Sequence, residues 1–221
     1  MNVTDLFMLG SPVEGAIFDL DGVLVDTAKY HYLAWKRLAL ELGFDFTEAD
    51  NERLKGVSRL RSLEILLEVG RITMSPGHKE QAAARKNAWY VEYLHTFNET
   101  ALLPGAKDFL LLLRETGIRI ALGSASKNAP LILERLNIAG LFDAVIDGNA
   151  VAAAKPDPEV FVRGASALGL PPERCVVFED ALAGIEAAKK GGMMVIGVGK
   201  PDLLPGADRY IACLADMMLQ N

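Results

Sequence analysis

GAIFDLDGVLVDTA, residues 15–28, predicts both the fold class and the chemistry of this chain. Residues 16–18 form a short apolar run bounded by Gly15, which is typical of a strand buried on both faces of a parallel sheet. Asp19 and Asp21 follow, and because side chains alternate along a strand, both leave its carboxyl end on the same side. In an open parallel sheet, ligands bind outside the carboxyl ends of the strands.

Two carboxylates in such a place need a positive partner. They repel each other, and burying them without a cation is unfavourable. A hard divalent cation with oxygen ligands, for which Mg²⁺ is the best fit, would relieve this repulsion. The tetrapeptide 19–22 is also ordinary loop chemistry after a strand, so alone it leaves a metal site and a plain turn equally open.

The composition is typical of a soluble globular protein and excludes several functions. The 221 residues are 51% hydrophobic and 24% charged, which suffices for one core domain and a smaller insert. No apolar run approaches the roughly 20 residues of a membrane span, and the first residues do not resemble a signal peptide. Cys175 and Cys213 lack metal-type spacing, and Cys175 lies in an apolar run typical of a core. The chain is therefore expected to be cytoplasmic. Its net charge of −6 argues against binding to nucleic acid or to anionic membranes.

Downstream of the first strand, the sequence predicts a run of helices. Residues 28–42 have a helical pattern that Thr27 could cap and that Gly43 ends. No credible strand occurs between residues 47 and 97. The helices predicted there begin near Thr47, near Arg61 and at Pro76.

From residue 104 onward, strands and helices alternate. The predicted strands cover residues 118–122, 144–146, 174–178, 193–198 and 210–212. This order is typical of a parallel sheet with helices on both faces. We therefore expect an α/β fold, with a Rossmann-like core formed by residues 1–26 and 100–221 and an α-helical domain inserted over residues 27–99.

Three of the later segments place polar residues where ligands would bind. Small residues and hydroxyls at 124–128 follow a strand, where backbone N–H groups can approach an anion. Glu179 and Asp180 also follow a strand, and a second pair of carboxylates is hard to explain by packing. Lys155, before a proline, is uninformative when taken alone.

Together these segments resemble the four motifs of the haloacid dehalogenase-like phosphotransferases, in order and with compatible spacing. The resemblance spans nearly the whole chain beyond the first dozen residues, and it implies that residues 27–99 form a helical cap domain. It implies that Asp19 is a nucleophile forming an aspartyl phosphate, that Asp21 is the general acid and base, and that Ser124 and Lys155 bind the transferring phosphoryl group. The implied Mg²⁺ ligands are Asp19, the carbonyl of Asp21, Glu179 and Asp180. Ala181 departs from the pattern, since a serine or threonine is expected there at least as often.

The inserted helices resemble those of the sugar phosphomutases in this family. The run 54–59, Leu-Lys-Gly-Val-Ser-Arg, could be a solvated turn, but it resembles the loop that holds the distal phosphate of the substrate. His31 and Trp35, one helical turn apart, could be part of a core stripe, but the resemblance implies that they face the same ligand. The run Arg85–Asn87, on the last of these helices, is similar to this family as well. A charge run on a helix is more typical of a solvated face, so Lys86 ranks below Arg59. The substrate-binding residues implied by the resemblance are Thr27, His31, Trp35, Lys55, Gly56, Val57, Arg59, Ser62, Lys86, Ser124, Ala125, Ser126, Lys127 and Asn128.

The resemblance implies a Mg²⁺-dependent phosphomutase that interconverts β-glucose 1-phosphate and glucose 6-phosphate. The intermediate and activator would be glucose 1,6-bisphosphate, and we expect a monomer acting on a small sugar phosphate. A sugar-phosphate phosphatase, in which water resolves the aspartyl phosphate, uses the same core residues and is the alternative. A catalytically silent sugar-phosphate-binding protein is a third possibility, but such a protein would more naturally have lost Asp19 or Asp180.

Overall fold

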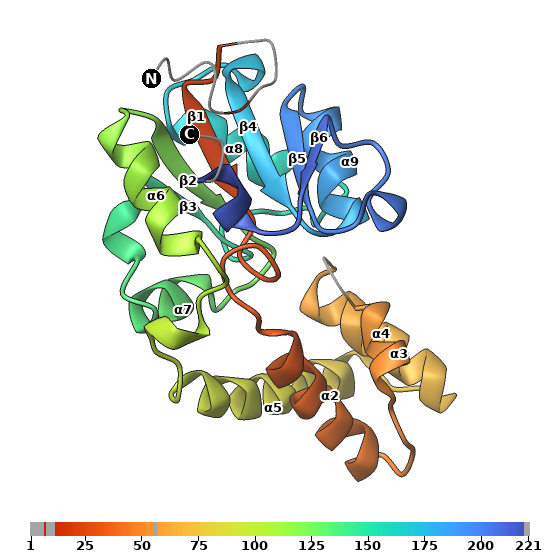
Figure 1. The fold of residues 1–221 in the computed structure, drawn as a ribbon. Helices are drawn as coiled ribbons and strands as arrows, with labels where there is room; N and C mark the ends of the chain where they lie inside the picture. Colours follow the sequence, from red (N-terminus) through yellow and green to blue (C-terminus); the bar gives the residue numbers. More distant parts are fainter. Residues whose placement is uncertain (1–6, 8–11, 55–56, 219–221) are drawn as a thin grey trace.

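The computed structural model of this chain contains a six-stranded sheet in which every strand is parallel to its neighbours (Figure 1). The structure describes residues 7, 12–54 and 57–218. In spatial order the strands are β3 (Ala144–Ile146), β2 (Arg119–Gly123), β1 (Gly15–Phe18), β4 (Cys175–Glu179), β5 (Met194–Val198) and β6 (Arg209–Ile211). This is the strand order of a Rossmann-like fold, so the predicted fold class is confirmed.

Helices cover both faces of the sheet because alternate side chains of its strands point to opposite sides. Phe18 and Phe178 lie on one face, where their rings stack with centroids 4.7 Å apart in the cluster that includes α6 and α7. Ile17 and Val177 lie on the other face, in the cluster that includes α8 and α9. Cys175 is buried in this second cluster, as predicted. The four helices are α6 (Ala106–Glu115), α7 (Ala129–Arg135), α8 (Glu159–Ala167) and α9 (Leu182–Lys190).

Between β1 and α6 the chain leaves the sheet and its described residues form four α-helices, which we call the helical insert. They lie together at the end of the sheet where β1 leads into α2 (Figure 1). No strand occurs among the described residues of this segment, as predicted. Its helices are α2 (Ala28–Glu41), α3 (Glu48–Glu52), α4 (Arg59–Gly70) and α5 (Pro76–Leu94).

Side-chain caps fix the starts of three of these helices. Thr47 and Asp50 form a reciprocal capping box at the start of α3. Ser58 accepts a hydrogen bond from the backbone N–H of Arg61 at 3.3 Å, so α4 begins with Arg59 in its first turn. Ser75 caps α5 in the same way, directly before a proline at the first helical position.

The two segments that connect the insert to the sheet lie side by side. Val25, before α2, forms an antiparallel bridge with Leu102, after α5. The backbone N–H of Leu103 donates to the carbonyl of Leu24 at 3.0 Å. The insert is therefore joined to the sheet through paired strands of backbone at one place.

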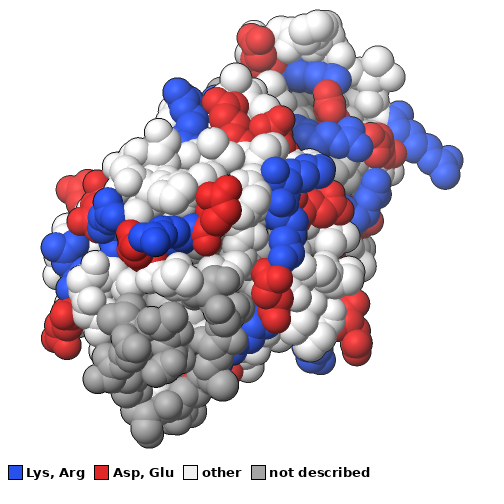
Figure 2. All heavy atoms as spheres, turned by 90° about the horizontal axis from the view of Figure 1, so that it is seen from above, with Lys and Arg blue, Asp and Glu red and all other residues white. Residues whose placement is uncertain are grey.

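The surface of the molecule mixes charges of both signs. On the face drawn in Figure 2, lysine and arginine side chains are interspersed with aspartate and glutamate side chains among the described residues. Such a surface offers no continuous basic track along that face for a nucleic-acid backbone. Among the residues that the structure describes, no helix has the length and apolar character needed to cross a membrane.

Candidate active site

Strands β1 and β4 bring three carboxylates to one point at the edge of the sheet. The register pairs Phe18 with Phe178, so Asp19 and Glu179 follow on neighbouring strands. Asp19, Glu179 and Asp180 each offer a carboxylate oxygen, and these oxygens all lie within 4.8 Å of one another. Closely spaced carboxylate oxygens are the ligands that Mg²⁺ prefers, so this donor set fits the predicted metal.

Lys155 reaches the same cluster from the loop before α8. Its Nζ donates to Oδ1 of Asp19 at 2.6 Å and to Oε2 of Glu179 at 2.8 Å, and its side chain is only 2% exposed. Burial opposes the charge of this ammonium, but the carboxylates of Asp19 and Glu179 outweigh that effect and raise the pKa of Lys155. Lys155 is therefore held as a cation between the two strand ends.

One ammonium does not balance the carboxylates around it. Burial, followed by the charge of Asp19, raises the pKa of Asp21 from 3.8 to about 6. Burial also raises the pKa values of Glu179 and Asp180, and the charge of Asp19 adds to both effects. Raised carboxyl pKa values mean that the ionised forms lack sufficient positive charge nearby. A divalent cation would supply it, which is a second reason why these residues fit Mg²⁺.

Two glycines leave room for this cluster. A Cβ atom at Gly22, where φ is +88°, would overlap the carboxylate of Asp180. A Cβ atom at Gly184, on α9, would overlap the carboxylate of Glu179. Sequence reasoning did not assign Gly184 a role; its signal was a glycine inside a helix, which often marks close packing. The backbone N–H of Ala181 donates to Oε1 of Glu179 at 3.1 Å, a bond that needs no hydroxyl at this position.

Thr27 holds Asp21 rather than the start of α2. The prediction that Thr27 caps α2 is wrong, because its side chain makes no capping hydrogen bond. The Thr27 hydroxyl instead donates to Oδ1 of Asp21. The backbone N–H of Asp21 in turn donates to Oδ2 of Asp19 at 3.1 Å. The backbone N–H and the carboxylate of Asp21 are thus each held by a hydrogen bond, and the first of these bonds is to Asp19.

The segment 124–128 connects β2 to α7 and contains a hydrogen bond between its two serines. Ser124 is 1% exposed, and its Oγ accepts a hydrogen bond from the backbone N–H of Ser126 at 3.1 Å. Ala125, Ser126 and Asn128 are half-buried, whereas Lys127 is exposed. The segment follows β2, whose register with β1 pairs Leu122 with Phe18, so it begins beside Asp19.

Lys86 is buried, whereas a charge run is more typical of a solvated helix face. It is 2% exposed because α5 packs against α2, and its Nζ lies 2.9 Å from Nδ1 of His31. The same ammonium lies 4.5 Å from the ring centre of Trp35 and 4.7 Å from that of Tyr90. Sequence reasoning missed Tyr90; its only signal is a spacing of four residues from Lys86, which places both on one face of a helix.

The insert brings together three basic side chains, and the charge of Asp21 offsets their effect on Lys86 only in part. Burial, followed by the charge of Arg59, lowers the pKa of Lys86 well below its ordinary value. Burial, Lys86 and Arg59, in that order, lower the pKa of His31 in the same direction. Burial also lowers the pKa of Arg59 itself. A phosphate group placed among these residues would relieve their mutual repulsion.

The structure places Arg59, the last residue of the predicted loop 54–59, in the first turn of α4. Val57 is half-buried and Ser62, on the same helix, is 5% exposed. Lys55 and Gly56 lie outside the described residues. Of the predicted specificity loop, the structure therefore describes Leu54 and residues 57–59.

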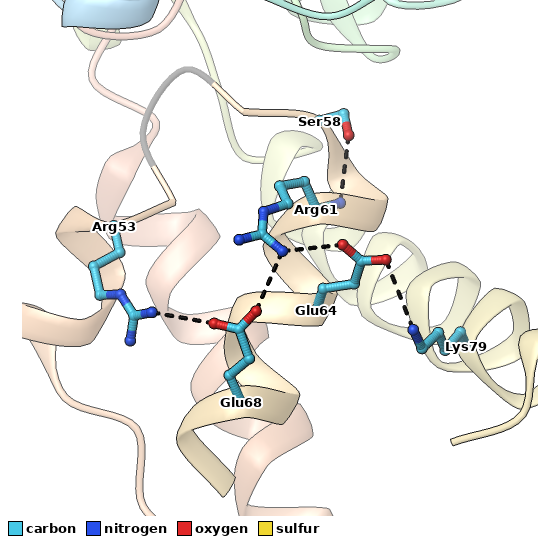
Figure 3. Close-up of polar contacts among 6 residues, drawn as sticks. All are labelled: Arg53, Ser58, Arg61, Glu64, Glu68 and Lys79. Carbon is cyan, nitrogen blue, oxygen red and sulfur yellow. Dashed lines mark hydrogen bonds and ion pairs between the residues drawn. The ribbon is translucent and has the colours of Figure 1, made fainter. Parts of the chain in front are cut away.

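Ion pairs link the two ends of that loop, as Figure 3 shows. Glu68 contacts Arg53, at the end of α3, at 3.3 Å and Arg61, in the first turn of α4, at 3.2 Å. Glu64 continues the network, contacting Arg61 at 3.2 Å and Lys79 of α5 at 3.7 Å. All five side chains are substantially exposed, so the network orients α3, α4 and α5 but adds little stability.

Known proteins resemble this chain over nearly its full length. The family model of the haloacid dehalogenase-like hydrolases matches residues 13–192. The chain is 41% identical over 210 residues to β-phosphoglucomutase of Bacillus subtilis, covering 94% of this chain and 93% of that protein. It is 33% identical over 184 residues to the phosphorylated carbohydrates phosphatase of Thermotoga maritima, covering 82% of each. The crystal structure of β-phosphoglucomutase from Clostridium difficile is similar with a TM-score of 0.89 and 39% identity, covering 92% of both chains.

Proposed function

Because this chain belongs to the haloacid dehalogenase-like hydrolase family, we propose that it is a phosphomutase that interconverts β-glucose 1-phosphate and glucose 6-phosphate. One observation carries the chemical part of this proposal. The carboxylate of Asp19 lies at the carboxyl edge of the sheet, with one oxygen bound by Lys155 and the other by the backbone N–H of Asp21. Such fixation prepares a carboxylate to attack phosphorus. The similarity to two β-phosphoglucomutases supports the choice of substrate.

In the proposed cycle, Asp19 carries the phosphoryl group between two positions of one sugar. Phosphorylated Asp19 transfers its phosphoryl group to the 6-hydroxyl of β-glucose 1-phosphate, and Asp21 accepts the proton of that hydroxyl. The glucose 1,6-bisphosphate formed then turns round, and Asp19 attacks the 1-phosphate. The bond from phosphorus to the sugar oxygen breaks, and Asp21 returns the proton to that oxygen. Its pKa of about 6 suits a group that both takes and gives a proton near neutral pH.

Charge neutralisation falls to residues around Asp19. We propose that Lys155 and Ser124 bind the oxygens of the transferring phosphoryl group, and that Asp19, the Asp21 carbonyl, Glu179 and Asp180 hold Mg²⁺. When bound, Mg²⁺ would neutralise charge developing on the phosphoryl oxygens. The unbalanced carboxylate charge and the spacing of the oxygens support this assignment.

We propose that residues 27–99 act as a cap over the core formed by residues 1–26 and 100–221. Arg59 would hold the phosphate that is not reacting, because a guanidinium can bind a phosphate through two parallel hydrogen bonds. The substrate-binding residues predicted from the sequence would line the rest of the cap and the segment 124–128. The lowered pKa values of Lys86 and His31 support an anion between cap and core. Closing the cap would keep water from the aspartyl phosphate.

This function is tested by measuring the isomerised sugar phosphate and the inorganic phosphate that appear in the same incubation. The protein is incubated with Mg²⁺, a trace of glucose 1,6-bisphosphate as activator, and in turn β-glucose 1-phosphate, its α-anomer and other sugar phosphates. We expect β-glucose 1-phosphate to become glucose 6-phosphate much faster than inorganic phosphate appears. The α-anomer should react poorly because it presents its phosphate from the other face of the ring.

A sugar-phosphate phosphatase is the second candidate, favoured by the similarity to the phosphorylated carbohydrates phosphatase of Thermotoga maritima. The same incubation separates the two. If inorganic phosphate appears as fast as the substrate disappears, and no glucose 6-phosphate accumulates, the phosphatase replaces the mutase.

We also infer that the protein acts as a monomer in the cytoplasm. Cys175 and Cys213 are both free thiols in the structure, as is usual in a reducing compartment.

A further inference from the structure

A pair of asparagines joins the helical insert to the segment 124–128. Nδ2 of Asn128 donates a hydrogen bond to Oδ1 of Asn87, on α5, at 2.9 Å. Both residues are half-buried, and 41 residues of sequence separate them. Asn87 stands in the sequence beside Lys86 and was not among the residues predicted to bind substrate.

Asn128 makes this contact instead of the one expected from its position. It is the N-cap residue of α7, where an asparagine side chain ordinarily accepts a hydrogen bond from a backbone N–H of the first turn. Its φ of −102° and ψ of 8° are not those of a capping residue, and its side chain makes no capping hydrogen bond. The amide of Asn128 is thus directed to the helical insert and not to its own helix.

Consecutive residues of α5 serve the two sides of the proposed site. Lys86 contacts His31 and feels the charge of Asp21, which raises its pKa against the stronger effect of burial. Asn87, the next residue, contacts Asn128. One stretch of α5 therefore touches both the residues beside the acid–base carboxylate and the segment 124–128.

A second contact joins α5 to α7. Nδ1 of His95, directly after α5, lies 2.9 Å from a guanidinium nitrogen of Arg135. Asn87 precedes His95 by eight residues, or roughly 12 Å along a helix. The insert is therefore held to the core at two separate points along α5.

We propose that Asn87 is a positioning residue for the proposed reaction, acting through Asn128. The hydrogen bond holds the insert against the segment 124–128, so that both sides contact one sugar phosphate. It uses one of the two N–H donors of the Asn128 amide and leaves the other donor and Oδ1 for a ligand. The identity of that ligand rests on the proposed function, whereas the contact between insert and core does not.

Two substitutions of similar size separate the hydrogen bond from the volume of the side chain. Asn87→Leu cannot accept the bond, whereas Asn87→Asp retains an acceptor oxygen. Amide hydrogen exchange is measured over residues 86–94 and 124–135 in each metal-free protein. We expect exchange to become several-fold faster in Asn87→Leu and to stay within twofold of wild type in Asn87→Asp. Gln81→Leu, on the exposed surface of the same helix, controls for the added apolar side chain.

Steady-state kinetics with β-glucose 1-phosphate provide the second readout. We expect Asn87→Leu to raise KM about fivefold, the loss of one net hydrogen bond, with kcat within twofold of wild type. In an Asn128→Ala background the same substitution should have no further effect, because its partner is already gone.

Unchanged exchange in Asn87→Leu, or effects of Asn87→Leu and Asn128→Ala that multiply in the double variant, would overturn the proposal. If the wild type converts no sugar phosphate, the proposed function fails, and the exchange rates alone then decide whether Asn87 holds the insert.

Discussion

The carboxylates around Asp19 carry more negative charge than Lys155 can balance, and this sets how the metal-free protein should respond to pH. The pKa of Asp21 is raised from 3.8 to about 6 in the folded state. A raised folded-state pKa means that the folded state binds the proton more tightly than the unfolded state does. Its contribution to stability is therefore complete below pH 3.8 and is lost as pH rises through about 6. Glu179 and Asp180 shift in the same direction and extend this loss upward.

We therefore expect the rise in Tm caused by Mg²⁺ to grow as pH increases from 5 to 8. The cation binds the ionised carboxylates, whose repulsion it relieves, and protons compete with it at low pH. At a concentration about 100 times its dissociation constant, Mg²⁺ should stabilise the protein by about 2.7 kcal/mol. Thermal unfolding with Mg²⁺ and with excess chelator gives both curves. A rise in Tm that is equal at pH 5 and pH 8 would show that these carboxylates do not hold the ion.

Among secondary-structure elements, α9 depends on a glycine that the acidic cluster needs. Gly184→Ala would force a methyl group into the carboxylate of Glu179. We expect a loss of stability of about 1–3 kcal/mol, as for other overpacked interiors, together with weaker Mg²⁺ binding. Denaturant unfolding and titration with Mg²⁺ measure the two effects.

Gly77→Ala is the matched control, since Gly77 also lies in a helix and a Cβ there meets no atom within 4 Å. That substitution should raise the free energy of unfolding, by up to about 1 kcal/mol, because alanine is the better helix former. If both alanines stabilise the protein alike, Gly184 does not shape the site.

The first turn of α4 presents two arginines with opposite surroundings. Arg61 lies outside, 51% exposed and paired with Glu64 and Glu68. Arg59 is half-buried, near enough to Lys86 and His31 to lower the pKa values of both. We expect Arg59→Ala to lose about 2–4 kcal/mol of transition-state stabilisation with β-glucose 1-phosphate, judged by kcat/KM.

Arg61→Ala should change kcat/KM with β-glucose 1-phosphate little, because exposed ion pairs contribute at most about 1 kcal/mol. For a small phosphate ester without a second phosphate, Arg59→Ala should lower kcat/KM much less than it does for the sugar phosphate. Equal losses with both substrates would place Arg59 away from the distal phosphate.

What the sequence could predict at this scale depended on local signals. The helices and strands were found because apolar periods and boundary signals such as Gly43, Thr47 and Pro76 are written in neighbouring residues. The cap role of Thr27 was predicted wrongly and the burial of Lys86 was not foreseen, because their partners, Asp21 and His31, are brought to them by folding. A threonine before a helix looks like a cap, and a lysine in a charge run looks solvated, until packing of α2 on α5 decides otherwise.

At the scale of the whole molecule, the sheet contributes acidic side chains to the proposed site and the helical insert contributes basic ones. The strand ends supply the carboxylates, and the insert supplies Arg59 and Lys86. The sequence predicted that strand ends would converge, since carboxyl ends of parallel strands meet at one edge. It did not predict the contact between Asn87 and Asn128, because nothing local relates two residues that are 41 positions apart.

The central claim is that the carboxylate of Asp19 accepts the phosphoryl group. Wild-type protein and Asp19→Asn are mixed with Mg²⁺ and glucose 1,6-bisphosphate, quenched in acid after a short interval, and digested for mass spectrometry of the peptide containing residues 15–28. We expect one phosphoryl group on Asp19 in the wild type. Asp19→Asn should carry none and should turn over no substrate while unfolding as cooperatively as the wild type. A phosphoryl group on another residue, or substantial turnover by Asp19→Asn, would contradict the account.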